Sequence, residues 1–199
     1  MAKSPGPVLR WWRKASLRRR AVVVVLAMGA FGAAALVGAW TRACANDACP
    51  DINTLEQYDA DQTSKLYAAD GRLITELGTQ RRTVVSLQQM APTIPQAFLA
   101  VEDKRFYEHN GIDWVRFLGA IKANILKLGM SEGFSTITMQ LVGNIFPEDI
   151  NRRERRGVAG VVRKIREAKL ALAIERKYPK EKILELYLNE IFLGIGSYG

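Results

Sequence analysis

Residues 101–111, VEDKRFYEHNG, place two adjacent carboxylates, two adjacent bases and two aromatic rings around His109, the single histidine of the chain. A helix turns 100° per residue, so in a helix Glu102 shares a face with Phe98 one turn earlier and Phe106 one turn later. A carboxylate between two phenyl rings is partly desolvated, which makes it a better proton acceptor near neutral pH. The stretch therefore suggests Glu102 as a general base, with an ordinary charged surface segment as the alternative.

Helix signals lie on both sides of this stretch. Pro95 favours the first turn of a helix and residues 110–111, Asn-Gly, favour its end, which places Glu102 in the middle. Asp113 favours the cap of a second helix, which ends at Gly129 and has apolar residues at core-facing spacing. Those apolar residues are Leu118, Ile121, Ile125 and Leu128.

Residues 130–140, MSEGFSTITMQ, predict a loop followed by a helix that starts near Ser135 and Thr136. Helix N-termini present unpaired N–H groups and the positive end of the helix dipole, so this start is a candidate phosphate site. Serine and threonine also begin many helices simply as caps, and the sequence leaves that alternative open.

Residues 152–182 are rich in bases, which suggests an anionic ligand. The helix predicted within them has an apolar stripe that we expect to face the core: Val161, Ile165, Ala168 and Leu172. A second face carries Arg156, Gly160, Arg163 and Glu167. Guanidiniums and a carboxylate one turn apart suit a diphosphate with a proton-transfer group or a divalent ion, and they also suit a salt-bridged surface.

The last helical pattern, KEKILELYLNEIFLG at residues 180–194, follows Pro179. Its polar face includes Glu185 and Asn189, which are one turn apart. We expect this face to be solvated, as polar helix faces usually are.

The first forty residues combine a basic tail with an apolar segment. Residues 21–40 are uncharged and, at 1.5 Å per residue, span about 30 Å, the thickness of a bilayer core. Residues 1–20 contain bases and no acid, so the positive-inside rule predicts a cytoplasmic tail with the later residues outside. Tryptophans and arginines beside an apolar segment fit an anionic membrane surface better than nucleic acid. A cleavable signal peptide is the alternative, because residues 43–45, ACA, resemble a cleavage site.

Residues 41–63 are polar and predict an extracytoplasmic linker. Cys44 and Cys49 lie at its start, where oxidising conditions outside the membrane favour a small disulfide loop. After it, the segments SKLY and RLITEL, separated by AADG, predict a β-hairpin.

Four motifs, taken in order, resemble the peptidoglycan glycosyltransferase module of class A penicillin-binding proteins and of monofunctional peptidoglycan glycosyltransferases. EDKRFYEHNG (residues 102–111) fits Glu-Asp-x-x-Phe-x-x-His-x-Gly, and GFSTITMQ (133–140) is close to Gly-x-Ser-Thr-Ile-Thr-Gln-Gln. RKIRE (163–167) fits Arg-Lys-x-x-Glu, and KEKILELYLN (180–189) fits Lys-x-x-Ile-Leu-Glu-x-Tyr-Leu-Asn. The resemblance covers residues 64–199 and implies a mainly α, lysozyme-like glycosyltransferase domain, incomplete at its C-terminus, behind one N-terminal transmembrane helix.

The resemblance also implies roles for individual residues. Glu102 would take the proton from the 4-hydroxyl of the acceptor sugar, and Glu167 would assist departure of the donor's lipid pyrophosphate, directly or through a divalent metal such as Mg²⁺ or Mn²⁺. The substrate-binding residues would be Asp103, His109, Ser135, Thr136, Gln140, Arg163 and Lys164. The sequence holds no metal-ligand motif, and no organic cofactor is expected.

The expected substrates are lipid II and the growing glycan chain, joined by a β-1,4 bond with inversion. Membrane lipids and other cell-wall synthesis proteins are expected partners at the bacterial inner membrane, and nucleic acid is not. Met139 and Gly143 stand where the family usually has glutamine and lysine. These departures favour the alternative of a catalytically weak, membrane-anchored module that binds lipid pyrophosphate or acts as a scaffold. A lysozyme-like hydrolase fits less well, because it needs a protonated acid and the bases around Glu167 favour the ionised carboxylate.

Overall fold

The computed structural model describes residue 6, residue 12 and residues 15–78, 80–127, 133–150 and 157–199. The chain divides into two compact units, Met1–Arg42 and Ala43–Gly199. In the first unit, helix α2 (Leu17–Arg42) contains the apolar segment, and within the described residues it is the helix long and apolar enough to cross a membrane. A signal sequence near an N-terminus has the same length and composition, so the helix itself is compatible with both interpretations.

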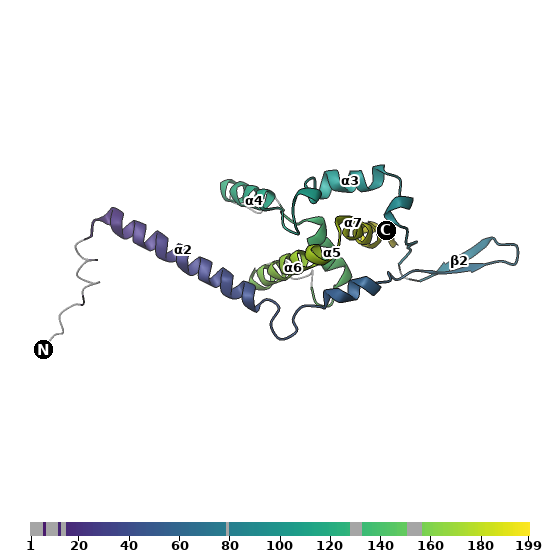
Figure 1. The fold of residues 1–199 in the computed structure, drawn as a ribbon, viewed down its shortest axis with the longest axis horizontal. Helices are drawn as coiled ribbons and strands as arrows, with labels where there is room; N and C mark the ends of the chain where they lie inside the picture. Colours follow the sequence, from purple (N-terminus) through teal and green to yellow (C-terminus); the bar gives the residue numbers. More distant parts are fainter. Residues whose placement is uncertain (1–5, 7–11, 13–14, 79, 128–132, 151–156) are drawn as a thin grey trace. The chain divides into compact units, whose positions relative to one another are not determined.

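The second unit is mainly helical, as expected (Figure 1). Its α-helices are α3 (Thr93–Glu102), α4 (Trp114–Leu126), α5 (Ile137–Ile145), α6 (Gly157–Lys177) and α7 (Lys180–Glu190). Its short 3-10 helices are η1 (Ile52–Gln57), η2 (Leu87–Gln89) and η3 (Phe106–Glu108). Helix α5 packs against both α6 and α7, and its Ile137, Leu141 and Val142 are fully buried. Short as it is, α5 is therefore central to the core.

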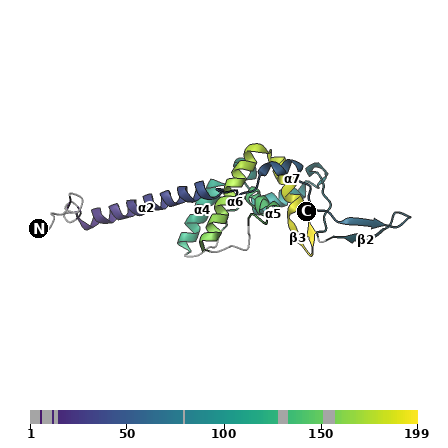
Figure 2. The same cartoon turned by 90° about the horizontal axis from the view of Figure 1, so that it is seen from below.

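Two local predictions are confirmed. Strand β1 (Ser64–Tyr67) pairs antiparallel with β2 (Leu73–Leu77), and this hairpin projects away from the helices (Figure 2). Cys44 and Cys49 form a disulfide. A second small sheet, β3 (Phe192–Gly194) with β4 (Ser197–Tyr198), ends the chain. Both confirmed features depend on residues close in sequence, which is where turn and cysteine spacing are most informative.

The segment expected to be a linker, residues 41–63, is largely part of the second unit. Leu55 of η1 is 1% exposed and belongs to the core, and Arg166 on α6 donates from Nε to the main-chain oxygen of Ala43 at 2.8 Å. Ala43 and η1 therefore contact α6. The polar composition concealed this because a single deeply buried side chain produces no apolar period.

Helix α6 buries the opposite face from the one expected. Its buried residues are Gly160, Glu167, Leu170, Ala171 and Ile174. Val161, the first residue of the expected apolar stripe, is 54% exposed. The polar face can turn inward because Arg163 and Lys164 both pair with Glu167 and so neutralise its charge. Arg156 lies outside the described residues.

The stripe on α4 is also not a core stripe, since Leu118 is 64% exposed and Ile121 is 40% exposed. The side chain of Ile125, and Leu128 and Gly129, lie outside the described part of the chain. The expected cap of α4 is confirmed, because Asp113 Oδ1 accepts from the main-chain N–H of Arg116 at 3.0 Å. Apolar periodicity identified the helix correctly but not what its apolar face contacts.

The polar face of α7 is not solvated. Asn189 accepts from the main-chain N–H of Val85 at 3.0 Å and donates to the carbonyl of the same residue at 2.9 Å. Glu185 accepts from the main-chain N–H of Leu87 at 2.9 Å. These side chains satisfy a stretch of extended backbone, so the expectation of a solvated face is wrong.

A buried charged cluster joins α7 to the segments before α3. The Arg82 guanidinium is 2.9 Å from the Glu190 carboxylate, and the Tyr58 hydroxyl donates to the same carboxylate at 2.7 Å. Burial and the hydrogen bond to Glu190 raise the pKa of Tyr58 well above its usual value. Burial also raises the pKa of Glu190. Tyr58, Arg82 and Glu190 have each lost contact with water, and their bonds to one another offset that cost.

This cluster predicts a pH effect on stability. The folded-state pKa of Tyr58 is above the unfolded value of about 10, so its contribution is complete below pH 10 and is lost as the pH rises through the folded-state pKa. Tyr58→Phe removes the ionisable group, so the fall in the free energy of unfolding above pH 10 becomes shallower. Urea unfolding of both proteins at a series of alkaline pH values measures this. Parallel curves for the two proteins would contradict it.

Candidate active site

Glu102 is the last residue of α3 and does not lie in the middle of a longer helix. The backbone leaves the helix at Asp103, where φ is −155° and ψ is 76°. Phe106 then belongs to the separate helix η3. The expected arrangement, with Glu102 between Phe98 and Phe106 on one helix face, is therefore wrong.

The helix ends here because Asp103 turns into the interior. Its carboxylate, 1% exposed, accepts from the main-chain N–H of Ile137 at 3.0 Å. It also lies 3.0 Å from His109 Nε2, and His109 is 7% exposed. Asp103 and His109 are thus buried partners that join the end of α3 to the start of α5. Their expected contact with substrate has no support in this geometry.

Thr136 caps α5. Its hydroxyl accepts from the main-chain N–H of Met139 at 3.2 Å and donates to the carbonyl of Gly111 at 2.7 Å, and the residue is fully buried. Together with Asp103 on the N–H of Ile137, this occupies N–H groups at the helix start. The capping alternative is confirmed, and with the N–H groups of Ile137 and Met139 occupied by side chains this geometry gives no support to a phosphate site here.

The Glu102 side chain is held from α5. Its Oε2 accepts from Gln140 Nε2 at 2.8 Å, and Gln140 Oε1 in turn accepts from the hydroxyl of Tyr187 at 3.3 Å. The Arg116 guanidinium donates to the main-chain oxygen of Glu102. Within the described residues, Glu102 Oε1 makes no hydrogen bond, so one carboxylate oxygen is left to accept a proton.

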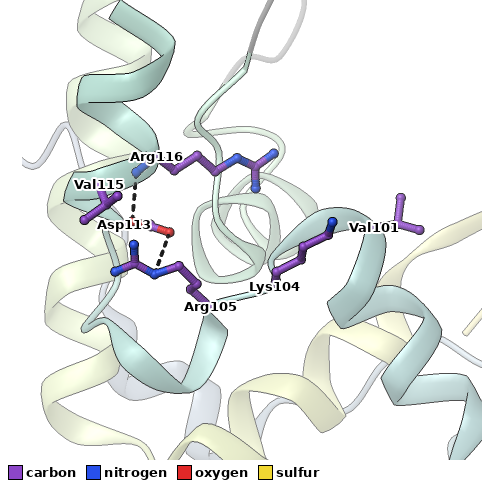
Figure 3. Close-up of a pocket in the computed structure, with 6 residues that line it drawn as sticks. All are labelled: Val101, Lys104, Arg105, Asp113, Val115 and Arg116. Atoms are coloured by element: carbon purple, nitrogen blue, oxygen red, sulfur yellow. Dashed lines mark hydrogen bonds and ion pairs between the residues drawn. The ribbon is translucent and has the colours of Figure 1, made fainter.

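A pocket of about 380 Å³ lies between the end of α3 and the start of α4 (Figure 3). Its lining residues are Val101, Lys104, Arg105, Asp113, Val115 and Arg116. Arg105 is 3.0 Å from Glu108 and 3.7 Å from Asp113, which offsets its charge. The sequence analysis missed Arg116 and Tyr187 as contributors to the site. The tyrosine of the fourth motif was an available signal for Tyr187, whereas nothing in the sequence pointed to Arg116.

The second carboxylate, Glu167, is 1% exposed and lies on α6. Its Oε1 accepts from Arg163 and its Oε2 accepts from Lys164 Nζ at 2.7 Å. Lys164 also donates to Ser135 Oγ at 2.6 Å. The structure therefore brings together four residues that the sequence singled out: Ser135, Arg163, Lys164 and Glu167. The two cations contact the carboxylate directly.

Residues 135–140 carry one contact to each carboxylate. Ser135 meets Lys164, which holds Glu167, and Gln140 meets Glu102. Ser135 and Thr136 precede α5, and Ile137–Gln140 form its first turn, so the two contact points are five residues apart in the chain. The start of α5 thus holds the two carboxylate clusters a short, fixed distance apart.

The donor set does not fit a divalent metal held by the protein. Within the described residues, no three histidine, cysteine, aspartate or glutamate side chains gather in a group that could hold a metal ion. Both oxygens of Glu167 already accept from cations. Mg²⁺ is commonly bound by one or two carboxylates together with substrate phosphates, so a metal at Glu167 would have to compete with Arg163 and Lys164 for the carboxylate oxygens.

Comparison with known proteins agrees with the motifs. The transglycosylase family model matches residues 70–199. Penicillin-binding protein 1A of Escherichia coli K12 is 43% identical over 152 residues, which is 75% of this chain and 17% of that protein. Penicillin-binding protein 1A of Aquifex aeolicus VF5 is 43% identical over 150 residues, 75% of this chain and 20% of that protein.

A third relative, penicillin-binding protein 1A/1B of Bacillus subtilis 168, is 40% identical over 137 residues, 69% of this chain and 14% of that protein. The chain spans one fifth or less of the length of each of these relatives. The family match covers residues 70–199 of this chain, which include Glu102 and Glu167. This chain belongs to the transglycosylase family, the glycosyltransferase module of class A penicillin-binding proteins.

Proposed function

We propose that this chain polymerises lipid II into β-1,4-linked glycan strands, with Glu102 as the general base. The observation that supports this most strongly is the pair of carboxylates joined through residues 135–140, one with a free oxygen and one surrounded by cations. A hydroxyl nucleophile needs a positioned base, and a diphosphate leaving group needs positive charge. The site supplies both.

In the proposed reaction, the 4-hydroxyl oxygen of the acceptor sugar attacks the anomeric carbon of the donor from the face opposite the diphosphate. The hydroxyl proton passes to Glu102 Oε1, while Oε2 stays bound to Gln140. The bond between the anomeric carbon and the diphosphate oxygen breaks, and its electron pair leaves with the lipid diphosphate. The configuration inverts, so an α-linked diphosphate gives a β-glycosidic bond.

Arg163 and Lys164 are the proposed countercharge for the leaving diphosphate. Glu167 holds both cations in place through its two oxygens, which fixes their positions before substrate arrives. Gly143, where the family usually has lysine, is buried in α5 and supplies no charge. The two α6 cations therefore carry more of the neutralisation than they would beside a third base.

The proposed setting is a bacterial plasma membrane, with the N-terminus cytoplasmic and residues from 43 onward outside. Support comes from helix α2, from the absence of acids in residues 1–20, and from the disulfide Cys44–Cys49, which suits an oxidising compartment. Lipid II and the growing glycan chain are the proposed substrates. Membrane lipids and other wall-synthesis proteins are proposed partners.

Replacing Arg163 tests the leaving-group site. Arg163→Ala removes one of two cations on Glu167, and a charge-assisted contact of this kind is worth about 10–100-fold in rate. We expect the rate of polymerisation of labelled lipid II to fall by that factor, with product of normal linkage. The readout is polymer formed by the full chain in detergent or liposomes.

The matched control is Arg176→Ala, which removes an exposed arginine from the same helix. We expect it to leave polymerisation unchanged. Equal activity of Arg163→Ala and the unaltered protein would remove Arg163 from the proposal. Absence of polymer from the unaltered chain, with lipid II still bound, would favour a non-catalytic binding module.

A further inference from the structure

We infer that Tyr187 is a positioning residue for the general base: its hydroxyl fixes the orientation of the Gln140 side-chain amide, which keeps Glu102 Oε2 occupied and leaves Oε1 to take the proton. This inference rests on the proposed function of Glu102. It assigns a reaction role to a residue of α7, a helix otherwise concerned with packing.

The contacts form a chain across three helices. Tyr187 on α7 is fully buried, and its hydroxyl donates to Gln140 Oε1 on α5 at 3.3 Å. Gln140 Nε2 donates to Glu102 Oε2 at the end of α3 at 2.8 Å. The Tyr187 ring also packs edge-on against Phe98, one turn before Glu102, with ring centroids 6.1 Å apart. The Tyr187 ring packs against α3, and the Tyr187 hydroxyl bonds to the Gln140 amide.

The Tyr187 hydroxyl matters because the Gln140 amide can be turned in either of two orientations. An ionised carboxylate only accepts hydrogen bonds, so Gln140 must present its NH₂ to Glu102 and its oxygen to Tyr187. Once Glu102 has taken a proton, that constraint disappears, because a carboxylic acid can donate to an amide oxygen. A flipped Gln140 would then draw the proton to Oε2, away from the substrate.

Tyr187 opposes this flip, because its hydroxyl donates to Gln140 Oε1 and would have to turn round to accept from a flipped NH₂ group. The amide N–H remains on Oε2, so the proton is received and released at Oε1. A phenol is suited to this task, since it stays protonated throughout the neutral range.

The charged groups near Glu102 are the same in the unaltered protein and in the variants used for the test. From α4, Arg116 donates to the Glu102 main chain, and Asp113 lies at the start of the same helix. From the segment after α3, Lys104 and Arg105 line the pocket between α3 and α4. From α5, the neutral Gln140 contacts Glu102, and the neutral Tyr187 of α7 contacts Gln140. A substitution of Tyr187 or Gln140 changes none of these charges.

The test is the pH dependence of kcat for Tyr187→Phe, measured with the full chain and labelled lipid II. The substitution keeps the ring in the core and removes only the hydroxyl. We expect the acid limb of the profile to move to higher pH by about 0.3–1 unit, because one hydrogen bond in the chain is lost. On that limb kcat falls about 2–10-fold, while KM is unchanged.

Two comparisons connect the effect to Gln140. Tyr58→Phe removes another hydroxyl that donates to a buried side chain, outside the proposed site, and we expect no shift in the limb. In a Gln140→Leu background, Tyr187→Phe should produce no further shift, since the intermediate amide is gone. A full effect of Tyr187→Phe in that background would overturn the inference. A fall in kcat of the same factor at every pH would also overturn it and would indicate a role in packing alone.

A measurement without turnover separates this inference from the proposed function. The titration of the Glu102 carboxyl, followed by carbon NMR and assigned with Glu102→Gln, should have a higher midpoint in Tyr187→Phe. An unchanged midpoint overturns the positioning role even if the unaltered chain polymerises lipid II. A shifted midpoint in a chain that makes no polymer supports the hydrogen-bond chain and overturns the proposed function instead.

Discussion

Glu102→Gln lowers the rate of lipid II polymerisation by about 10²–10⁴-fold, the contribution typical of a general base. Glutamine has the shape of glutamate, and its oxygen can still accept from Gln140, so the fold should be retained. What it lacks is the ability to take a proton at the position of Oε1. The rate of polymer formation, measured across pH, tests the loss of activity. A thermal unfolding curve tests whether the fold is retained.

Glu108→Gln is the matched control, since it makes the same change six residues later at an exposed carboxylate that pairs only with Arg105 among the described residues. We expect it to retain nearly full activity, because a surface pair of this kind contributes little. Near-normal polymerisation by Glu102→Gln would show that Glu102 is not the general base. Equal losses in the two variants would point to a general effect of charge on this segment.

Gly111→Ala has the largest expected effect on stability. Gly111 has φ of +92°, and a Cβ there would lie 2.9 Å from the main-chain carbon and oxygen of Ala171 and from the main-chain nitrogen of Leu172. The backbone conformation costs about 1–2 kcal/mol for a non-glycine residue. The collision with α6 adds about 1–3 kcal/mol, because backbone atoms cannot rotate away. Urea unfolding should show the sum, a loss of about 2–5 kcal/mol.

Gly71→Ala separates the two contributions. Gly71 has a similar φ of +83° in the hairpin turn, but nothing lies within 4 Å of the position of an added Cβ. It should therefore lose only the conformational part, about 1–2 kcal/mol. If the two alanine variants lose equal stability, the close approach of Gly111 to α6 is not a tight contact. Loss of activity in Gly111→Ala at temperatures where it remains folded would show that the approach also positions α5, through the bond from Thr136 to Gly111.

The sequence predicted correctly the features that depend on neighbouring residues. The hairpin turn, the Cys44–Cys49 pair, the cap at Asp113 and the helix start at Thr136 all follow from local chemistry, and all are present. The cluster of Ser135, Lys164 and Glu167 was also singled out, because motif resemblance carries information about distant contacts that periodicity does not contain.

Several of the errors share a physical cause: polar side chains that satisfy one another were not expected to be buried. Glu167 is buried on the face of α6 that looked like surface, since two cations occupy its oxygens. Asn189 is buried because its side-chain amide bonds to the main-chain N–H and carbonyl of Val85, as a neighbouring strand would. Asp103 ends α3 early for the same reason, since its acceptor needs are met by α5 and His109. Such pairings are visible only when both partners are placed in three dimensions.

The short stretch from Ser135 to Gln140 also constrains how this protein can diverge. An inserted residue there would rotate everything after it by 100° and advance it by 1.5 Å, so Gln140 would no longer point at Glu102 while Ser135 kept its contact with Lys164. No side-chain replacement can correct such a change of phase. We therefore expect an insertion in this segment to disrupt the site more than exchange of one side chain for another.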